Sequence, residues 1–114
     1  KNLKFVSSFC WLVHDKNCIP KGLFYYTVHV WIYSFGQGFL IQQRSMFVKR
    51  LPEQWTITSG TVLHSETSLM AAQREVQEEL GIKMNVEEVE LVYQYRRDQH
   101  FVDVLYIEKK YWTK

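Results

Sequence analysis

The sequence predicts a mixed α/β fold of the α+β type, in which a β-sheet packs against one long helix. Strand-like segments precede and follow a single segment with helical periodicity, roughly Glu66 to Leu80. The longest strand-like segment, Phe24 to Tyr33, is β-branched or aromatic almost throughout, which suits a strand covered on both faces. We therefore expect it to form the central strand of a sandwiched sheet.

Length and composition indicate one ordinary globular domain, residues 1–114. Hydrophobic residues make up 46% of the 114 residues and charged residues 23%, which is enough for a single core and no more. The chain begins at Lys1 rather than Met and stops at Lys114 soon after a strand-like segment. We therefore expect it to be truncated at one or both ends.

Charge and cysteine content restrict the expected partners and location. The net charge is +2, and the basic residues are spread out rather than clustered in the stripe that a nucleic-acid polymer requires. The sequence contains no apolar run long enough for a membrane span and no visible signal peptide, so no membrane partner is expected. Cys10 and Cys18 do not form a CxxC arrangement, and we interpret them as thiols of a cytoplasmic protein.

The segments before the helix carry strand and turn signals. Gly36 and Gly38 favour a tight turn, after which the chain is expected to pair back as a hairpin. A polar loop with a proline then leads into a short strand. In order, we expect strands at Phe5 to Val13, Phe24 to Tyr33, Phe39 to Arg44 and Trp55 to Thr58, with the loop at Ser45 to Gln54.

The helix has clear start and stop signals. Ser65 or Thr67 can cap its start, and Glu66 and Ser68 suit the positive end of the helix dipole. Gly81 is placed for a left-handed C-terminal cap. These signals favour a helix that ends just before Gly81.

Two further alternating segments follow the helix. They are Val86 to Tyr95 and Phe101 to Ile107, with Arg96 to His100 as their turn. One helix cannot cover both faces of a sheet, so we expect a further C-terminal helix outside the chain given by the sequence.

The polar and apolar faces of the helix can be separated at about 100° per residue. Glu75, Glu78 and Glu79 share one arc, centred about 110° from the apolar arc, at the edge of the buried face. Like charges three and four residues apart repel on a helix, so this crowding suggests that a cation belongs there. The apolar arc, expected to face the core, consists of Leu69, Ala72, Val76 and Leu80.

Three partly shielded carboxylates form a hard-oxygen site for a divalent cation. Mg²⁺ suits such ligands together with waters and phosphate oxygens, and Mn²⁺ tolerates the same set. Arg74, four residues before Glu78, can hydrogen-bond to a carboxylate and orient it. The alternative is an acidic, solvated helix face, and the glutamates alone do not decide between the two interpretations.

The wider segment resembles the Nudix (MutT-like) family. The box of that family has a glycine, five residues, a glutamate, seven residues, Arg-Glu, an aliphatic residue, any residue, Glu-Glu, any residue, a glycine and an aliphatic residue. A chance match in a chain of this size is on the order of 10⁻⁸ to 10⁻⁷. All defining positions are met, by Gly60, Glu66, Arg74, Glu75, Val76, Glu78, Glu79, Gly81 and Ile82.

The flanks resemble more weakly the Nudix branch that includes isopentenyl diphosphate isomerase and related hydrolases. The similar segments are Trp11 to Asn17, Val28 to Ile32 and Ile41 to Ser45, with Lys49, Pro52 and Trp55. Two glycines that are usual in that branch are replaced here, by Ser59 and Ser65. Because neither is a defining box position, the departure bears on the shape of the loop rather than on metal binding.

The resemblance implies a Mg²⁺-dependent hydrolase, with Mn²⁺ as a substitute, that cleaves the diphosphate bond of a nucleoside diphosphate linked to another group. It implies that Glu75, Glu78 and Glu79 ligate the metal and that the Gly60 carbonyl adds a ligand. It further implies catalytic roles for Arg74, which orients a glutamate, for Glu75, and for Glu66, which holds the loop.

A general base is also required for such hydrolysis. Glu75 is one candidate, and Asp98 and Asp103, in the later segments, are the others. His29 and His64 are interpreted as structural.

Substrate contacts are expected upstream of the box. Arg44 and Lys49 lie where the resembling branch places cations that contact phosphate, with surface charge as the alternative. Trp55 or Phe47 could stack on the substrate or pack in the core.

Two other functions compete with hydrolysis. A non-catalytic Nudix module used for binding or regulation commonly lacks box glutamates, and none is lost here. An isomerase of the isopentenyl diphosphate type needs a cysteine beyond the first strands, but none follows Cys18. The expected partner is a small-molecule diphosphate whose identity the sequence does not give, and a homodimer is possible because many relatives form one.

Overall fold

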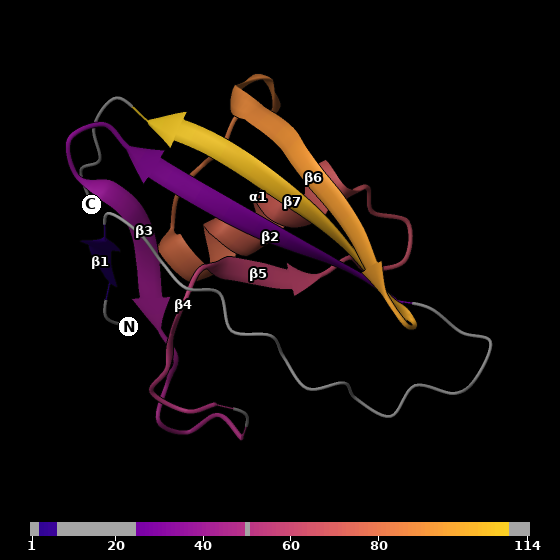
Figure 1. The fold of residues 1–114 in the computed structure, drawn as a ribbon, viewed down its shortest axis with the longest axis horizontal. Helices are drawn as coiled ribbons and strands as arrows, with labels where there is room; N and C mark the ends of the chain where they lie inside the picture. The colour runs from indigo at the N-terminus through magenta and orange to yellow at the C-terminus, as the bar shows by residue number, and fades with distance from the viewer. Residues whose placement is uncertain (1–2, 7–24, 50, 110–114) are drawn as a thin grey trace.

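The computed structural model describes residues 3–6, 25–49 and 51–109, which form a mixed sheet packed against one helix, α1 (Ser68–Leu80) (Figure 1). The sheet has the order β1-β3-β2-β7-β6, with β4 paired to β3 and β5 paired to β2. The predicted fold class is confirmed. The strands are β1 (Leu3–Val6), β2 (Tyr25–Ser34), β3 (Gly38–Gln43), β4 (Trp55–Thr56), β5 (Thr58–Thr61), β6 (Val89–Arg97) and β7 (His100–Lys109).

The central position predicted for the aromatic strand is confirmed in β2. This strand runs parallel to β7 over ten residue pairs and antiparallel to β5 on its other side. Its alternate residues Val28, Val30 and Ile32 are buried, as expected for the side that packs against a helix. Parallel pairing of β2 and β7 requires a long crossover, and α1 lies within it.

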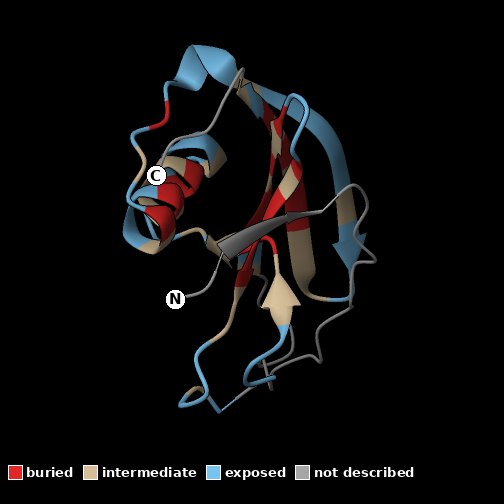
Figure 2. Ribbon diagram, turned by 90° about the vertical axis from the view of Figure 1, so that its left-hand side faces the viewer, coloured by how far each residue is buried: buried red, intermediate tan, exposed pale blue. Residues whose placement is uncertain are grey.

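The core lies between α1 and the sheet, where the buried face of the helix meets the buried strand residues (Figure 2). The predicted core face of the helix is partly wrong. Leu69 is 37% exposed, whereas Ala71 is fully buried. The reason is that α1 packs on β5 as well as on β2, and Glu75, one turn after Ala71, lies against Gly60 of β5. The buried arc is therefore shifted toward the glutamate edge.

Both helix caps follow the predicted chemistry. Thr67, rather than Ser65, is the N-cap, and its hydroxyl accepts a hydrogen bond from the Met70 amide at 3.1 Å. Gly81 has φ +71° and donates its amide hydrogen to the Gln77 carbonyl. The helix begins at Ser68, two residues after the predicted start.

Several predicted strands differ in their bounds. The strand predicted at Trp55 to Thr58 is split into β4 and β5, which pair with different neighbours. The segment predicted to begin at Val86 starts with a 3₁₀ turn, η1 (Val86–Glu88), and β6 then carries a bulge between Leu91 and Tyr93. Within the first predicted strand the structure describes only β1, so Cys10 and Trp11 lie outside the described residues, as does Cys18.

The loop that leads into the helix holds Ser65 at φ +74°, a conformation that disfavours residues with a Cβ. This is one of the two positions where the resembling branch has glycine. Ser65→Gly is expected to raise the free energy of unfolding by about 0.5–1 kcal/mol, because relief of the left-handed strain exceeds the extra entropy of glycine in the unfolded chain. Urea denaturation measures the change, and Ser65→Ala, which retains the strain, is the matched control. Equal stabilisation by both variants would contradict the backbone explanation.

In the part of the chain that the structure describes, no helix is both long and apolar enough to cross a membrane. Whether residues 1–114 form one domain stays a prediction.

Candidate metal and diphosphate site

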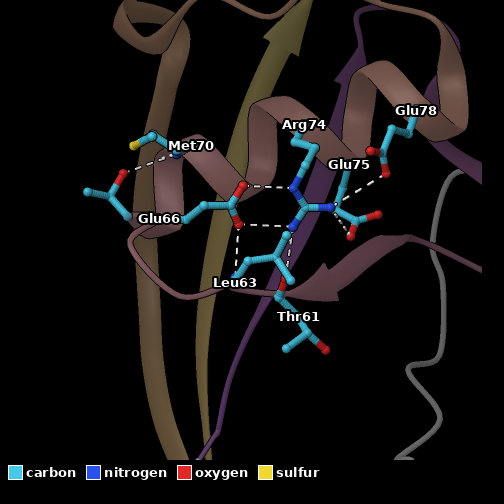
Figure 3. A network of polar contacts seen from close by, with 8 residues as sticks. Thr61, Leu63, Glu66, Met70, Arg74, Glu75 and Glu78 are labelled. Atoms are coloured by element: carbon cyan, nitrogen blue, oxygen red, sulfur yellow. Dashed lines mark hydrogen bonds and ion pairs between the residues drawn. The ribbon is translucent and has the colours of Figure 1, made fainter.

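A network centred on Arg74 ties the loop before the helix to the helix itself (Figure 3). The Arg74 Nε donates to Glu66 Oε2 at 2.7 Å and its Nη2 donates to Glu66 Oε1 at 3.0 Å, which is a bidentate pair. Nη2 also donates to the Thr61 carbonyl at 3.0 Å, and Glu66 Oε1 accepts from the Leu63 amide at 2.9 Å. The loop is thereby closed onto the middle of α1.

The bidentate pair shifts the pKa values of both partners. Hydrogen bonds from the Arg74 guanidinium, and then from the Leu63 amide, lower the pKa of Glu66 from 4.5 to about 2. The same contact with Glu66 raises the pKa of Arg74. The loop therefore keeps its ion pair at every pH at which the protein is expected to act.

This pair predicts a pH-dependent contribution to stability. Because the pKa of Glu66 is lower in the folded state, its contribution is present above pH 4.5 and is lost as the pH falls toward about 2. We expect Glu66→Gln to unfold more easily than wild type at pH 7 and to differ from it less at pH 2. Urea denaturation at several pH values, with the exposed Glu87→Gln as control, checks this. A difference from wild type that stays constant between pH 7 and pH 2 would argue against the pair.

The remaining Arg74 nitrogen connects the helix glutamates. Nη1 lies 3.0 Å from Glu75 Oε2 and 3.5 Å from Glu78 Oε1. The Glu75 side chain is 13% exposed and that of Glu78 is 58% exposed. One guanidinium thus gathers two of the predicted metal ligands on the same side of the helix, one shielded and one facing solvent.

Gly60 of β5 lies directly beneath Glu75. A Cβ built at Gly60 would stand 2.0 Å from Glu75 Oε2 and 2.5 Å from its Cγ, far closer than atoms can approach. Only a residue without a side chain allows the carboxylate to rest on the strand at this point. The first and fourth defining positions of the box are therefore in direct contact.

The third helix glutamate faces a pocket. Glu79 Oε1 accepts a hydrogen bond from Gln42 Nε2 on β3 at 2.5 Å. The pocket has a volume of about 120 Å³ and includes Arg44 and Glu79 in its wall. It lies between the last turn of α1 and the strands β3 to β5, and its full lining is Gln42, Arg44, Ser45, Val48, Thr56, Ile57, Ser59 and Glu79.

The glutamates fit a divalent cation by chemistry rather than by a preformed cage. Among residues 3–6, 25–49 and 51–109, no group of three carboxylate, imidazole or thiol side chains is gathered as a metal site. Glu75 and Glu78 turn toward Arg74 and Glu79 toward Gln42. The donor set itself, three carboxylates on one helix edge beside the backbone of Gly60, is of the hard-oxygen kind that Mg²⁺ and Mn²⁺ take.

Of the substrate-binding residues predicted upstream of the box, some line the pocket and others lie at the surface. Arg44 lines the pocket together with Glu79. Lys49 is exposed and Trp55 is half-buried on β4, and neither lines the pocket. Phe47 is 87% exposed, so it does not pack in the core.

Asp103 does not lie beside the metal candidates. It is buried on β7, where it accepts hydrogen bonds from Ser68 Oγ and, at 2.9 Å, from Gln94 Nε2. Ser68 is in the first turn of α1 and Glu78 in the last, which places them about 15 Å apart along the helix. This position supports a structural role for Asp103.

The remaining titratable candidates also lie in structural positions. Asp98 occupies the turn between β6 and β7 with φ +56°. His29 is buried within β2, with its ring 6.4 Å from that of Tyr95. His64 is exposed in the loop before the helix. Of the candidate bases, only Glu75 lies among the metal candidates.

Sequence reasoning missed Gln42. This residue is 4% exposed on β3 and contacts Glu79. A signal was present, because Gln42 is in phase with the buried Leu40, two residues earlier on the same strand, and a polar residue at an inward position needs a partner.

Comparison with solved structures shows the class of fold. A MutT/nudix family protein from Enterococcus faecalis superposes with a TM-score of 0.69 at 16% identity, over 82% of this chain and 39% of that one. A bifunctional NMN adenylyltransferase/ADP ribose pyrophosphatase from Francisella tularensis, complexed with AMP and a Mn ion, superposes with a TM-score of 0.61 at 20% identity, over 84% of this chain and 30% of that one. At these identities the likeness concerns the fold alone.

Comparison of sequences shows the family. The NUDIX domain model matches residues 24–113, and a Nudix hydrolase of Listeria monocytogenes is 35% identical over 92 residues, which are 80% of this chain. The chain belongs to the Nudix family. It spans 54% of the length of that Listeria relative. The closer likeness of its flanks to the isopentenyl diphosphate isomerase branch stays a prediction.

Proposed function

We propose that this protein is a Nudix pyrophosphohydrolase that cleaves the diphosphate bond of a nucleoside diphosphate linked to another group. The observation that carries the proposal is the Arg74 network, in which one guanidinium contacts Glu66, Glu75 and Glu78 beside a pocket that reaches Glu79. Glu79, on the same helix edge, lines a pocket that also contains a cation, Arg44. Mg²⁺ is the proposed cofactor, with Mn²⁺ as a substitute.

The metal would be held by Glu75, Glu78 and Glu79, with the Gly60 carbonyl as a further ligand. A divalent cation supplies charge neutralisation of the diphosphate and lowers the pKa of a bound water. The surrounding residues position the metal ligands. Arg74 fixes the directions of the Glu75 and Glu78 carboxylates, and Glu66 keeps Arg74 in place. Glu75, whose side chain is 13% exposed against 58% for Glu78, is the proposed general base.

The diphosphate would enter the pocket beside Glu79. Arg44 offers a planar set of donors that matches phosphate oxygens, and Ser45 and Ser59 line the same pocket. Ser59 stands where the resembling branch has glycine, so that departure bears on the pocket rather than on the metal ligands. The cytoplasmic location and the homodimer stay predictions.

The role of Arg44 predicts a specific kinetic change. We expect Arg44→Ala to raise KM by about tenfold or more and to change kcat by less than threefold, because one charged hydrogen-bonding group is lost from both the ground state and the transition state. Steady-state kinetics measures both constants. Arg97→Ala, on the exposed end of β6, is the matched control and should leave both unchanged. A change confined to kcat would show that Arg44 does not act in uniform substrate binding.

A substrate panel tests the proposed function. Nucleotide sugars, dinucleotides, oxidised nucleoside triphosphates and non-nucleotide diphosphates are incubated with the protein and Mg²⁺ or Mn²⁺, and the phosphate released by a coupling phosphatase is measured. Turnover of at least one class, abolished by EDTA, is expected. Binding detected by thermal shift without turnover would favour the non-catalytic module instead. Isomerisation of isopentenyl diphosphate would overturn the proposal in favour of the isomerase.

A further inference from the structure

Gln42 connects the strand β3 to the last turn of the helix. Its side chain is almost fully buried, with the residue 4% exposed. Nε2 donates to the Thr58 hydroxyl at 3.2 Å and to Glu79 Oε1 at 2.5 Å. A side-chain amide nitrogen has two hydrogens, so these two bonds use its full donor capacity. The hydrogen bond to Thr58 of β5 therefore holds the Gln42 side chain in place, and Gln42 in turn holds the Glu79 carboxylate.

We propose that Gln42 is a positioning residue that orients the Glu79 carboxylate toward the divalent cation, an inference that rests on the proposed function. Holding Oε1 in one place also sets the direction of the second carboxylate oxygen. An amide is a neutral donor, so it fixes the carboxylate without offsetting the negative charge that attracts a cation. Hydrogen-bonding partners of this kind tune metal affinity by orienting the ligand.

The location of Gln42 links the metal candidates to the substrate pocket. Gln42 and Arg44 are two residues apart and both line the pocket. Glu79 lies at the same wall. One side chain thus joins the carboxylate expected to face the metal to the segment expected to face the phosphates.

Mn²⁺ binding by the metal-free protein, without substrate, tests the inference. Free Mn²⁺ is followed by electron paramagnetic resonance during titration of the full chain. Gln42→Met, which keeps the length of the side chain but has no donor, is expected to raise the Kd for Mn²⁺ by about 10- to 100-fold. Gln43→Met, at the next position and bonded to the Glu53 carbonyl instead, is the matched control and should bind as wild type does.

Thr58→Val provides a second variant that loosens Gln42 without altering it. It is expected to raise the Kd by a smaller factor than Gln42→Met. In turnover assays, saturating Mg²⁺ should restore kcat in Gln42→Met, as expected for a variant that has lost affinity for the metal alone. Wild-type affinity in the folded Gln42→Met variant, or in Thr58→Val if Gln42→Met does not fold, would overturn the positioning role. Failure of the wild type itself to bind Mn²⁺ would instead overturn the metal site of the proposed function, and the inference with it.

Discussion

Glu79→Gln is expected to lower the kcat/KM of any accepted diphosphate by about 10³-fold or more while leaving the fold intact. The substitution removes one of three negative charges proposed to hold the metal, and a 10³-fold loss corresponds to about 4 kcal/mol of transition-state stabilisation. The fold should tolerate it because Glu79 lies at the edge of the buried helix face and glutamine can still accept the Gln42 hydrogen bond. Steady-state kinetics at saturating Mg²⁺ measures the loss, and circular dichroism checks the fold.

Glu87→Gln is the matched control for this variant. Glu87 is an exposed glutamate in the 3₁₀ turn that precedes β6, so its replacement changes the net charge equally without touching the site. It should retain wild-type turnover. Equal turnover by Glu79→Gln and wild type would contradict the metal assignment.

Gly60→Ala is expected to lower kcat/KM by about 10²- to 10³-fold and the free energy of unfolding by about 1–3 kcal/mol. The added Cβ would coincide with the Glu75 carboxylate, 2.0 Å from Oε2 and 2.1 Å from Cδ. Glu75 must therefore swing away from β5 and from its 3.0 Å contact with Arg74. Most of the effect should appear in catalysis because a flexible side chain can yield where a strand cannot.

Gly36→Ala separates this steric effect from ordinary backbone strain. Gly36 has φ +84°, and nothing lies within 4 Å of a Cβ built there. Gly36→Ala should lower the free energy of unfolding without affecting kcat/KM, whereas Gly60→Ala should act mostly on kcat/KM. If both variants lose stability and retain activity, the contact between Gly60 and Glu75 has no catalytic importance. Urea denaturation and steady-state kinetics on both variants give the comparison.

Local signals predicted the helix and its acidic edge well. The helix was predicted from the periodicity of its apolar residues, from the capping threonine and from Gly81. Each of these signals depends only on residues that are close in sequence. The contact of Arg74 with Glu75 also lies within the box, where Arg74 was expected to orient a glutamate, but its bidentate pair with Glu66 was not expected. These features needed no knowledge of which strand the helix would meet.

Local signals could not predict the contacts between residues that are distant in sequence. Leu69 was expected in the core because its angle on the helix is right, but the packing of α1 on β5 moved the buried face toward Ala71. The hydrogen bond between Gln42 and Glu79 joins residues 37 positions apart, and no local pattern pairs them. The split between β4 and β5 likewise follows from their pairing with different strands.

The dependence of turnover on metal, in the wild type and in Glu75→Gln, tests the central claim most directly. With the best substrate of the panel, the initial rate is measured as Mg²⁺ is added to EDTA-treated protein. The proposed mechanism predicts no turnover without metal, a saturable rise in the wild type, and no comparable rise in Glu75→Gln at any Mg²⁺ concentration. Turnover that survives EDTA, or a Glu75→Gln variant that follows the wild-type curve, would contradict it.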